Sequence, residues 1–174
     1  MKIRSLENTK VMRYIFLIVI FAVITASGMS QRVKVKLNND KFTEFKERWN
    51  TKKQVRKGNR AFKEGTFASY KQAAEHFKVA YDKINDNAAL TYMLGMSYLK
   101  SVPATKALEY LEIAYNQNKN VHPDQIYYYA RALQLNYKFE EAINKYTEYK
   151  NTLTAEQLVF KDIQLKKRIS ECRY

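Results

Sequence analysis

The sequence contains little of the residue types that build cross-links and turns: one cysteine, two prolines and four glycines among 174 residues. The lone cysteine, Cys172, cannot form a disulfide within the chain, and with His76 and His122 it lacks the spacing of a familiar zinc site. So few glycines and prolines leave little material for the turns of an all-β fold. The length suits one domain and excludes two large ones.

The sequence also lacks the motifs of common catalytic sites. It contains no G-x-S-x-G, no H-E-x-x-H and no glycine-rich phosphate loop. The adjacent carboxylates Glu140 and Glu141 point in different directions on a helix, and negative charge is favourable where a helix begins. We therefore expect no enzyme activity, no cofactor and no bound metal.

The first thirty residues follow the order of regions that is typical of a secretory signal peptide. A basic stretch up to Arg13 precedes an apolar run over 14–24, and small residues follow up to Ser30. The run is shorter than the roughly 20 residues that span a bilayer. We expect cleavage before Gln31 and an exported chain, periplasmic or associated with the outer membrane. An uncleaved N-terminal anchor is the alternative.

Positive charge is concentrated in the N-terminal third. The formal net charge is +14, and residues 31–63 contribute twelve Lys or Arg against three Asp or Glu, a net +9. Such a segment can meet an acidic protein, an anionic lipid or glycan surface, or nucleic acid; it can also be an ordinary solvated face. With an export signal and no RNA-binding motif, we expect no nucleic-acid partner.

A recurring set of residues predicts helical hairpins. Three residues at spacing i, i+4 and i+7 lie on one face of a helix, where it packs against a neighbour. Such sets recur at intervals of 34 and then 35 residues: Ala73, Phe77 and Ala80; Ala107, Leu111 and Ala114; Ala142, Tyr146 and Tyr149. A period of this length resembles the tetratricopeptide repeat (TPR).

Residues 91–98 (TYMLGMSY) resemble the W-x-x-L-G-x-x-Y half of the TPR pattern, with threonine in place of tryptophan. Gly95 is costly inside a helix, so we expect two helices to approach closely there. Gly58 takes this role in the first unit and Ala130 in the third. The resemblance covers residues 52–150 and implies an all-α fold, an α-solenoid of about three TPR hairpins with a C-terminal capping helix.

These patterns divide the chain into a signal peptide (1–30), a basic segment with an amphipathic helix (31–50), three TPR units (51–86, 87–120 and 121–151) and a capping helix (152–174). Helices are expected near 52–64, 70–84, 87–100, 104–117, 123–135, 139–150 and 155–171. Fifteen residues separate Gly58 from Ala73, against twelve in the other units, which predicts a longer loop within 65–70.

Local signals support these boundaries. Capping boxes are expected at Thr51 with Gln54 and at Thr154 with Gln157, and both prolines, Pro103 and Pro123, are expected in first turns. In the last helix, one side is expected to carry Leu158, Ile163 and Ile169, opposite Lys166, Lys167 and Arg168.

The segment before the repeats is less regular. Val33, Val35 and Leu37 alternate with charged residues, which predicts a short strand or an extended tail. Residues 39–49 carry aromatic side chains at helical spacing, Phe42, Phe45 and Trp49, and we expect this amphipathic helix to cover the first repeat. The alternative is contact of its aromatics and lysines with a membrane surface.

In a TPR stack the first helix of each hairpin lines the concave face. The residues of these helices that are not needed for packing predict a partner-binding groove: Lys52, Arg56, Asn59, Tyr92, Met96, Lys100, Tyr127, Arg131 and Gln134. Some TPR domains grip acidic chaperone tails with a clamp of lysine, asparagine and arginine. Asn59 matches one clamp position, but the others hold Val55, Met93, Asp124 and Tyr128, which argues against that ligand.

The chain also resembles the exported N-terminal part of bacterial envelope proteins that join TPRs, a WD40-like propeller and an OmpA-like peptidoglycan-binding domain. The resemblance rests on the signal peptide, residues 57–59 (KGN) with Phe62, residues 92–98 (YMLGMSY), and Glu171 with Cys172. It implies the front part of a larger protein, a scaffold for protein–protein interaction in the cell envelope, in a type IX secretion, gliding or outer-membrane assembly. Peptidoglycan binding is not implied, because no part of the sequence matches that domain.

The alternative function is a structural envelope protein that docks on anionic lipid or glycan through its basic N-terminal third. The partner's identity and the oligomeric state stay open.

Overall fold

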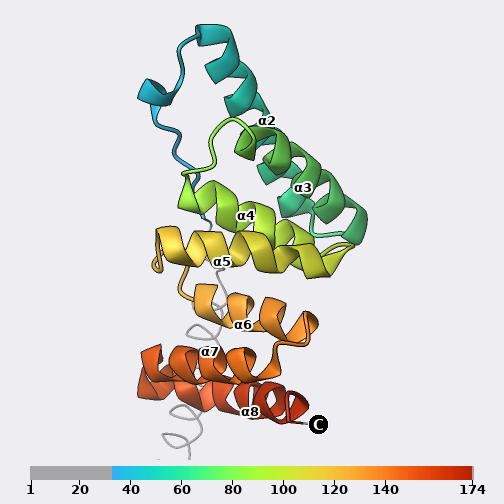
Figure 1. Cartoon of the computed structure of the whole chain (residues 1–174), viewed down its shortest axis with the longest axis vertical. Helices are drawn as coiled ribbons and strands as arrows, with labels where there is room; N and C mark the ends of the chain where they lie inside the picture. Colours follow the sequence, from blue (N-terminus) through green and yellow to red (C-terminus); the bar gives the residue numbers. More distant parts are fainter. Residues whose placement is uncertain (1–32, 174) are drawn as a thin grey trace, which may run out of the picture. The chain divides into compact units, whose positions relative to one another are not determined.

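The computed structural model describes residues 33–173, and this part of the chain is all helical, without a strand. Its elements are η1 (Asn39–Lys41), α2 (Phe45–Glu64), α3 (Phe67–Tyr81), α4 (Ala88–Leu99), η2 (Ala104–Lys106), α5 (Ala107–Gln117), α6 (Gln125–Leu135), α7 (Phe139–Thr152) and α8 (Ala155–Glu171). Each α-helix packs against the next along the chain (Figure 1). The predicted signal peptide and its cleavage position lie outside the described residues.

The core is built from the recurring residue sets. All nine of their side chains are at most 2% exposed, including the large rings of Phe77, Tyr146 and Tyr149. The prediction that these positions pack between helices is confirmed. None of the helices between residues 33 and 173 combines the length and hydrophobicity that a membrane crossing requires.

The two helical glycines mark close helix contacts, as predicted. A Cβ on Gly58 would lie 2.7 Å from the Phe77 ring, and a Cβ on Gly95 would lie 2.8 Å from Cγ of Leu111. Each glycine therefore allows the first helix of a hairpin to approach the bulky central residue of the second. α2 meets α3 in this way, and α4 meets α5.

The helix α2 corrects the predicted boundary at Thr51. It is one continuous helix of 20 residues, so the amphipathic segment and the first repeat helix are not separate. Thr51 lies inside it, 3% exposed, and its hydroxyl donates to the Glu47 carbonyl at 3.0 Å rather than capping a first turn. The helix continues because no glycine or proline occurs between Phe42 and Gly58.

The connection between α2 and α3 is also shorter than predicted. Only Gly65 and Thr66 separate the two helices, so the additional residues of this hairpin lengthen its helices. Gly65 has a φ of 74°, the left-handed conformation that commonly ends a helix. Thr66 and Ser69 form a capping box that starts α3.

The start of α8 agrees with its prediction, whereas both prolines differ from theirs. Thr154 and Gln157 form the expected capping box. Pro103 precedes η2, and Pro123 lies two residues before α6. The buried Gln125 side chain accepts from the Val121 amide (3.1 Å) and donates to the Asn118 carbonyl (3.0 Å), which fixes a loop ahead of α6.

The segment before η1 is extended and forms no strand. Val33, Val35 and Leu37 are half-buried against the core. The side-chain amide of Asn87 donates to the Lys36 carbonyl at 2.7 Å. This segment is therefore the extended tail among the two predicted alternatives, and it lies against the start of α4.

The packed face of α8 corrects the prediction for Ile163. This side chain is 81% exposed, whereas Leu165 is 1% exposed. Leu165 lies seven residues after Leu158 and four before Ile169, so these three share one helix face, and the other two are half-buried. Ile163 lies on the opposite face.

Candidate functional site

The most highly charged surface of the described chain is the outward side of α2. The helix contains eight Lys or Arg and two Glu. Val55, Gly58 and Ala61 are buried, and at helical spacing this leaves a fully exposed set on the other side, which we call the basic face: Lys52, Lys53, Arg56, Arg60 and Lys63. Within residues 33–173, none of these five side chains forms an ion pair.

Two aromatic side chains lie at the beginning of α2. Phe45 is 73% exposed and Trp49 is 47% exposed, so the prediction that they cover the first repeat is wrong. α2 has 20 residues and α3 has 15, and the tight turn aligns their adjoining ends. The first five residues of α2 therefore extend past the end of α3, which cannot cover them.

A cationic group lies close to each of the two rings, Phe45 and Trp49. The Arg48 guanidinium carbon lies 5.2 Å from the Phe45 ring centroid, and Nζ of Lys53 lies 4.8 Å from the Trp49 ring centroid. These distances suit cation–π attraction. The exposed rings and the basic face thus form one continuous strip along α2.

The predicted groove residues of the first unit lie on this strip. Lys52, Arg56 and Asn59 are all exposed. Lys52 Nζ donates to Oδ1 of Asn39 in η1 at 3.2 Å, while the structure gives Arg56 and Asn59 no hydrogen bond from their side chains. These three residues are exposed on the outward side of the helix, and Arg60 and Lys63, which the predicted groove did not include, follow at the same helical spacing.

The groove residues of the second unit are not equally accessible. Tyr92 is 2% exposed and Met96 is 4% exposed, so both belong to the core. The Tyr92 ring stacks on His122, with centroids 5.7 Å apart, because the loop before α6 lies over α4. Burial raises the pKa of Tyr92. Lys100 is exposed, with Nζ 5.2 Å from the Tyr70 ring centroid.

The groove residues of the third unit are joined to one another and to α8. Tyr127, Arg131 and Gln134 are half-buried. Gln134 Oε1 accepts from Arg131 Nη1 at 2.7 Å and from the Tyr146 hydroxyl at 2.9 Å, and its amide nitrogen donates to Glu171 at 3.2 Å. The Tyr127 ring centroid lies 5.7 Å from that of Tyr146. These side chains hold α6, α7 and α8 together.

A second polar network joins the same three helices. Lys161 Nζ of α8 donates to Oδ1 of Asp124 at 2.6 Å, and the Tyr149 hydroxyl of α7 donates to the same oxygen. Burial opposes ionisation of Asp124, but the hydrogen bonds from Lys161 and Tyr149 outweigh it, so its pKa is lowered. The network stabilises the attachment of α8.

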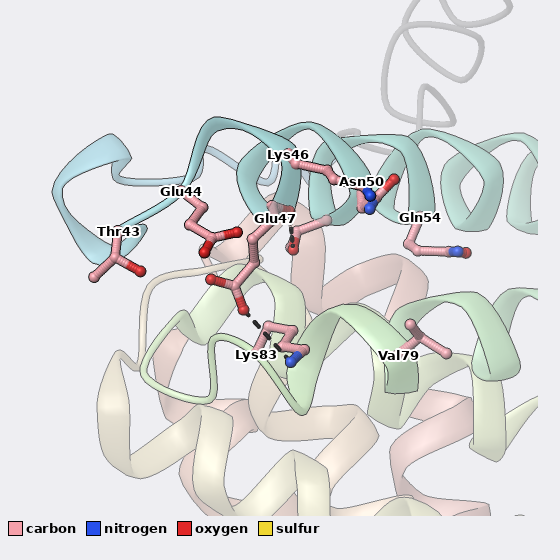
Figure 2. Close-up of a pocket in the computed structure, with 9 residues that line it drawn as sticks. Thr43, Glu44, Lys46, Glu47, Asn50, Gln54, Val79 and Lys83 are labelled. Carbon is pink, nitrogen blue, oxygen red and sulfur yellow. Dashed lines mark hydrogen bonds and ion pairs between the residues drawn. The ribbon is translucent and has the colours of Figure 1, made fainter.

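A pocket of about 590 Å³ lies beside the first half of α2 (Figure 2). Glu47 points toward Lys83 across it, with 3.4 Å between the carboxylate and Nζ. Val79 is its only apolar lining residue, whereas small-molecule pockets are lined mainly by apolar groups. In the part of the chain that the structure describes, no three His, Cys, Asp or Glu side chains group together as metal ligands.

Comparison with known proteins identifies no relative of this chain. No family model matches the chain, and no curated protein matches it. The most distinctive surface of the described chain is the strip of α2, which combines exposed aromatic rings with cations that form no ion pair.

Proposed function

We propose that the chain is an exported helical scaffold of the TPR type, which binds a protein partner in the bacterial cell envelope as part of a secretion or outer-membrane assembly. Two features support the repeat. The residues that recur at 34 and 35 residues are buried, and Gly58 and Gly95 make equivalent close contacts in successive hairpins. Export rests on the order of regions in residues 1–30.

The basic face of α2 is the proposed contact surface. The observation that carries this assignment is five exposed cations without an ion pair among the described residues, along one side of one helix. Such a surface attracts a partner with an acidic patch and accelerates its association. The remaining groove residues contribute less surface, since Tyr92 and Met96 are buried and the trio of the third unit is bonded to α8.

A charge-reversal experiment tests the contact surface. Arg56→Glu with Arg60→Glu reverses two charges of the basic face; Lys71→Glu with Lys106→Glu makes the same charge change at exposed positions elsewhere. Each variant is used to capture proteins from the native envelope fraction, followed by mass spectrometry. We expect one specific partner, with an acidic surface, to be lost with the first variant and retained with the second. Equal recovery by both folded variants would rule out the basic face.

Anionic lipid or glycan is the second candidate partner, and the exposed rings of Phe45 and Trp49 favour it. A membrane-surface helix combines cations with aromatic side chains that enter the interface. Trp49 is the only tryptophan, so its fluorescence reports this event directly. Vesicles of phosphatidylglycerol and phosphatidylcholine, at low and high salt, provide the probe.

The vesicle result separates the two candidates. Lipid docking predicts a blue shift of the Trp49 emission and co-sedimentation that weakens with salt. Vesicles of phosphatidylcholine alone serve as the control, because they offer no net negative charge. An unchanged emission spectrum with phosphatidylglycerol at low salt would eliminate lipid docking and leave the protein partner.

A further inference from the structure

The outward face of α8 carries three exposed apolar side chains within five residues of one another. Val159 is 74% exposed, Phe160 is 69% exposed and Ile163 is 81% exposed. They lie opposite Leu165, the only residue of α8 that is fully buried. A helix that exposes apolar groups next to one another commonly has a partner on that side.

The residues on this face follow the spacing of a helix–helix seam. Glu156, Phe160, Ile163 and Lys167 are separated by intervals of four, three and four residues, the alternation that places side chains along one line of a helix. Glu156 and Lys167 are both exposed, and within residues 33–173 neither forms an ion pair. The seam therefore has an apolar centre and one exposed charged residue at each end.

The order of these charges distinguishes between possible partners. The acid is at the N-terminal end of the seam and the base is at the C-terminal end. When a second α8 lies antiparallel, Phe160 meets Ile163 of the second copy, and Glu156 meets Lys167 of the second copy. In a parallel pair, like charges would meet at both ends. The face is thus complementary to itself in the antiparallel orientation.

We propose that α8 binds α8 of a second copy of this chain, antiparallel, about a two-fold axis between Phe160 and Ile163. A two-fold axis uses every contact twice, so two apolar contacts and two ion pairs form. The proposal goes beyond the proposed function and uses a surface separate from α2. A helix of 17 residues is about 26 Å long and supplies less than the roughly 800 Å² per partner of a stable interface, so the dimer is weak.

Sedimentation velocity over about 5 to 500 µM, a range that covers weak association, measures the self-association of the purified chain. We expect a concentration-dependent dimer. Ile163→Glu places a carboxylate against Phe160 of the second copy and should weaken the dimer at least thirtyfold. Gln164→Glu, an exposed neighbour off the seam, adds the same charge and should leave the dimer unchanged.

Charge reversal provides a second and independent readout. Glu156→Lys and Lys167→Glu should each weaken the dimer by about tenfold, because two pairs of opposite charges become like charges. The double variant restores the complementarity in reversed order and should recover the affinity. All variants change exposed positions, and circular dichroism confirms their helix content.

Four results would overturn the proposal. A wild-type chain that stays monomeric over the whole range excludes it. A dimer that persists with Ile163→Glu places the interface elsewhere, and a double charge variant that remains weak excludes the antiparallel pairing. A monomer that uses this face to retain a different envelope protein also contradicts it. The α2 variants should leave this equilibrium unchanged, so failure here is distinguishable from failure of the proposed function.

Discussion

α2 and α8 are the longest helices of the described chain, and each packs only one face against its neighbour (Figure 1). Their outward faces differ in kind. α2 presents cations, with eight Lys or Arg against two Glu, whereas α8 presents apolar residues between one acid and one base. A strongly positive surface repels a copy of itself and attracts opposite charge, while a charge-balanced apolar surface can pair with itself. One chain can in this way offer two surfaces that do not compete.

The inward faces of the two helices differ as well. α2 is held by close packing, because four of its residues are buried and one of them, Gly58, lies against the Phe77 ring. α8 has one fully buried residue, Leu165, and depends more on hydrogen bonds and ion pairs with α6 and α7. We therefore expect α8 to be more sensitive to pH than α2, and the following predictions test this contrast in order of decreasing effect.

The largest effect should follow Leu165→Ala. Truncation of a fully buried leucine removes apolar contact and leaves a cavity, which costs about 2–5 kcal/mol of unfolding free energy. Ile163→Ala on the exposed side should change it by less than about 0.5 kcal/mol. Urea denaturation at low protein concentration measures both. Equal effects would show that the packed face of α8 is assigned incorrectly.

Gly58→Ala tests the packing of α2. Alanine favours a helix over glycine by about 1 kcal/mol, but its Cβ would meet the Phe77 ring, and overpacking costs about 1–3 kcal/mol. We expect a net destabilisation of up to about 2 kcal/mol in the same urea measurement, the difference between these two effects. Phe77→Leu in the same chain should recover part of the loss by making room. A simple sum of the two single effects would show that the residues do not interact.

The two capping boxes allow a matched comparison. Thr66→Ala removes the cap of α3, the partner of α2, and Thr154→Ala removes the cap of α8. Each alanine substitution should lower the free energy of unfolding by about 1 kcal/mol, whereas serine at either position should restore most of the stability. Thermal unfolding by circular dichroism measures the change. A serine variant as unstable as the alanine variant would contradict a capping role.

The smallest effect concerns pH. The pKa of Asp124 is lower in the folded chain than in the unfolded chain, so its ionised carboxylate stabilises the fold at pH values above the unfolded-state pKa. This stabilisation is lost as the pH falls through the folded-state pKa, below about pH 4. The resulting loss of unfolding free energy should be about 1 kcal/mol or less. Hydrogen exchange should show α8 losing protection before α2 on acidification, and Asp124→Asn should reduce this difference. Simultaneous loss in both helices would count against a local cause.

The residues that recur at fixed intervals could be predicted from the sequence because burial depends on spacing along a helix. The spacing predicts that Phe77, Leu111 and Tyr146 lie in the core, and all three are buried. The same repeat spacing predicts the close helix contacts at Gly58 and Gly95. These features depend on one helix and its immediate neighbour, so the local pattern determines them.

Features that depend on more than a helix and its immediate neighbour could not be predicted in this way. α8 carries two apolar stripes, and the sequence does not indicate which of Ile163 and Leu165 faces α7. Phe45 and Trp49 are exposed because α3 ends before it reaches them, which a helical pattern within residues 39–49 cannot show. Tyr92 is buried because the loop with His122 lies over α4.

Cys172, at the end of α8, is a natural reporter of that helix. It is the only thiol in the chain, and it is 6% exposed. Burial, with the charge of Glu171 nearby, raises its pKa and suppresses the reactive thiolate. A thiol reagent therefore reaches it mainly when α8 detaches, so the labelling rate measures how often α8 opens. In an oxidising compartment, each opening also presents an unpaired thiol to other proteins, which links the attachment of α8 to protection from intermolecular disulfides.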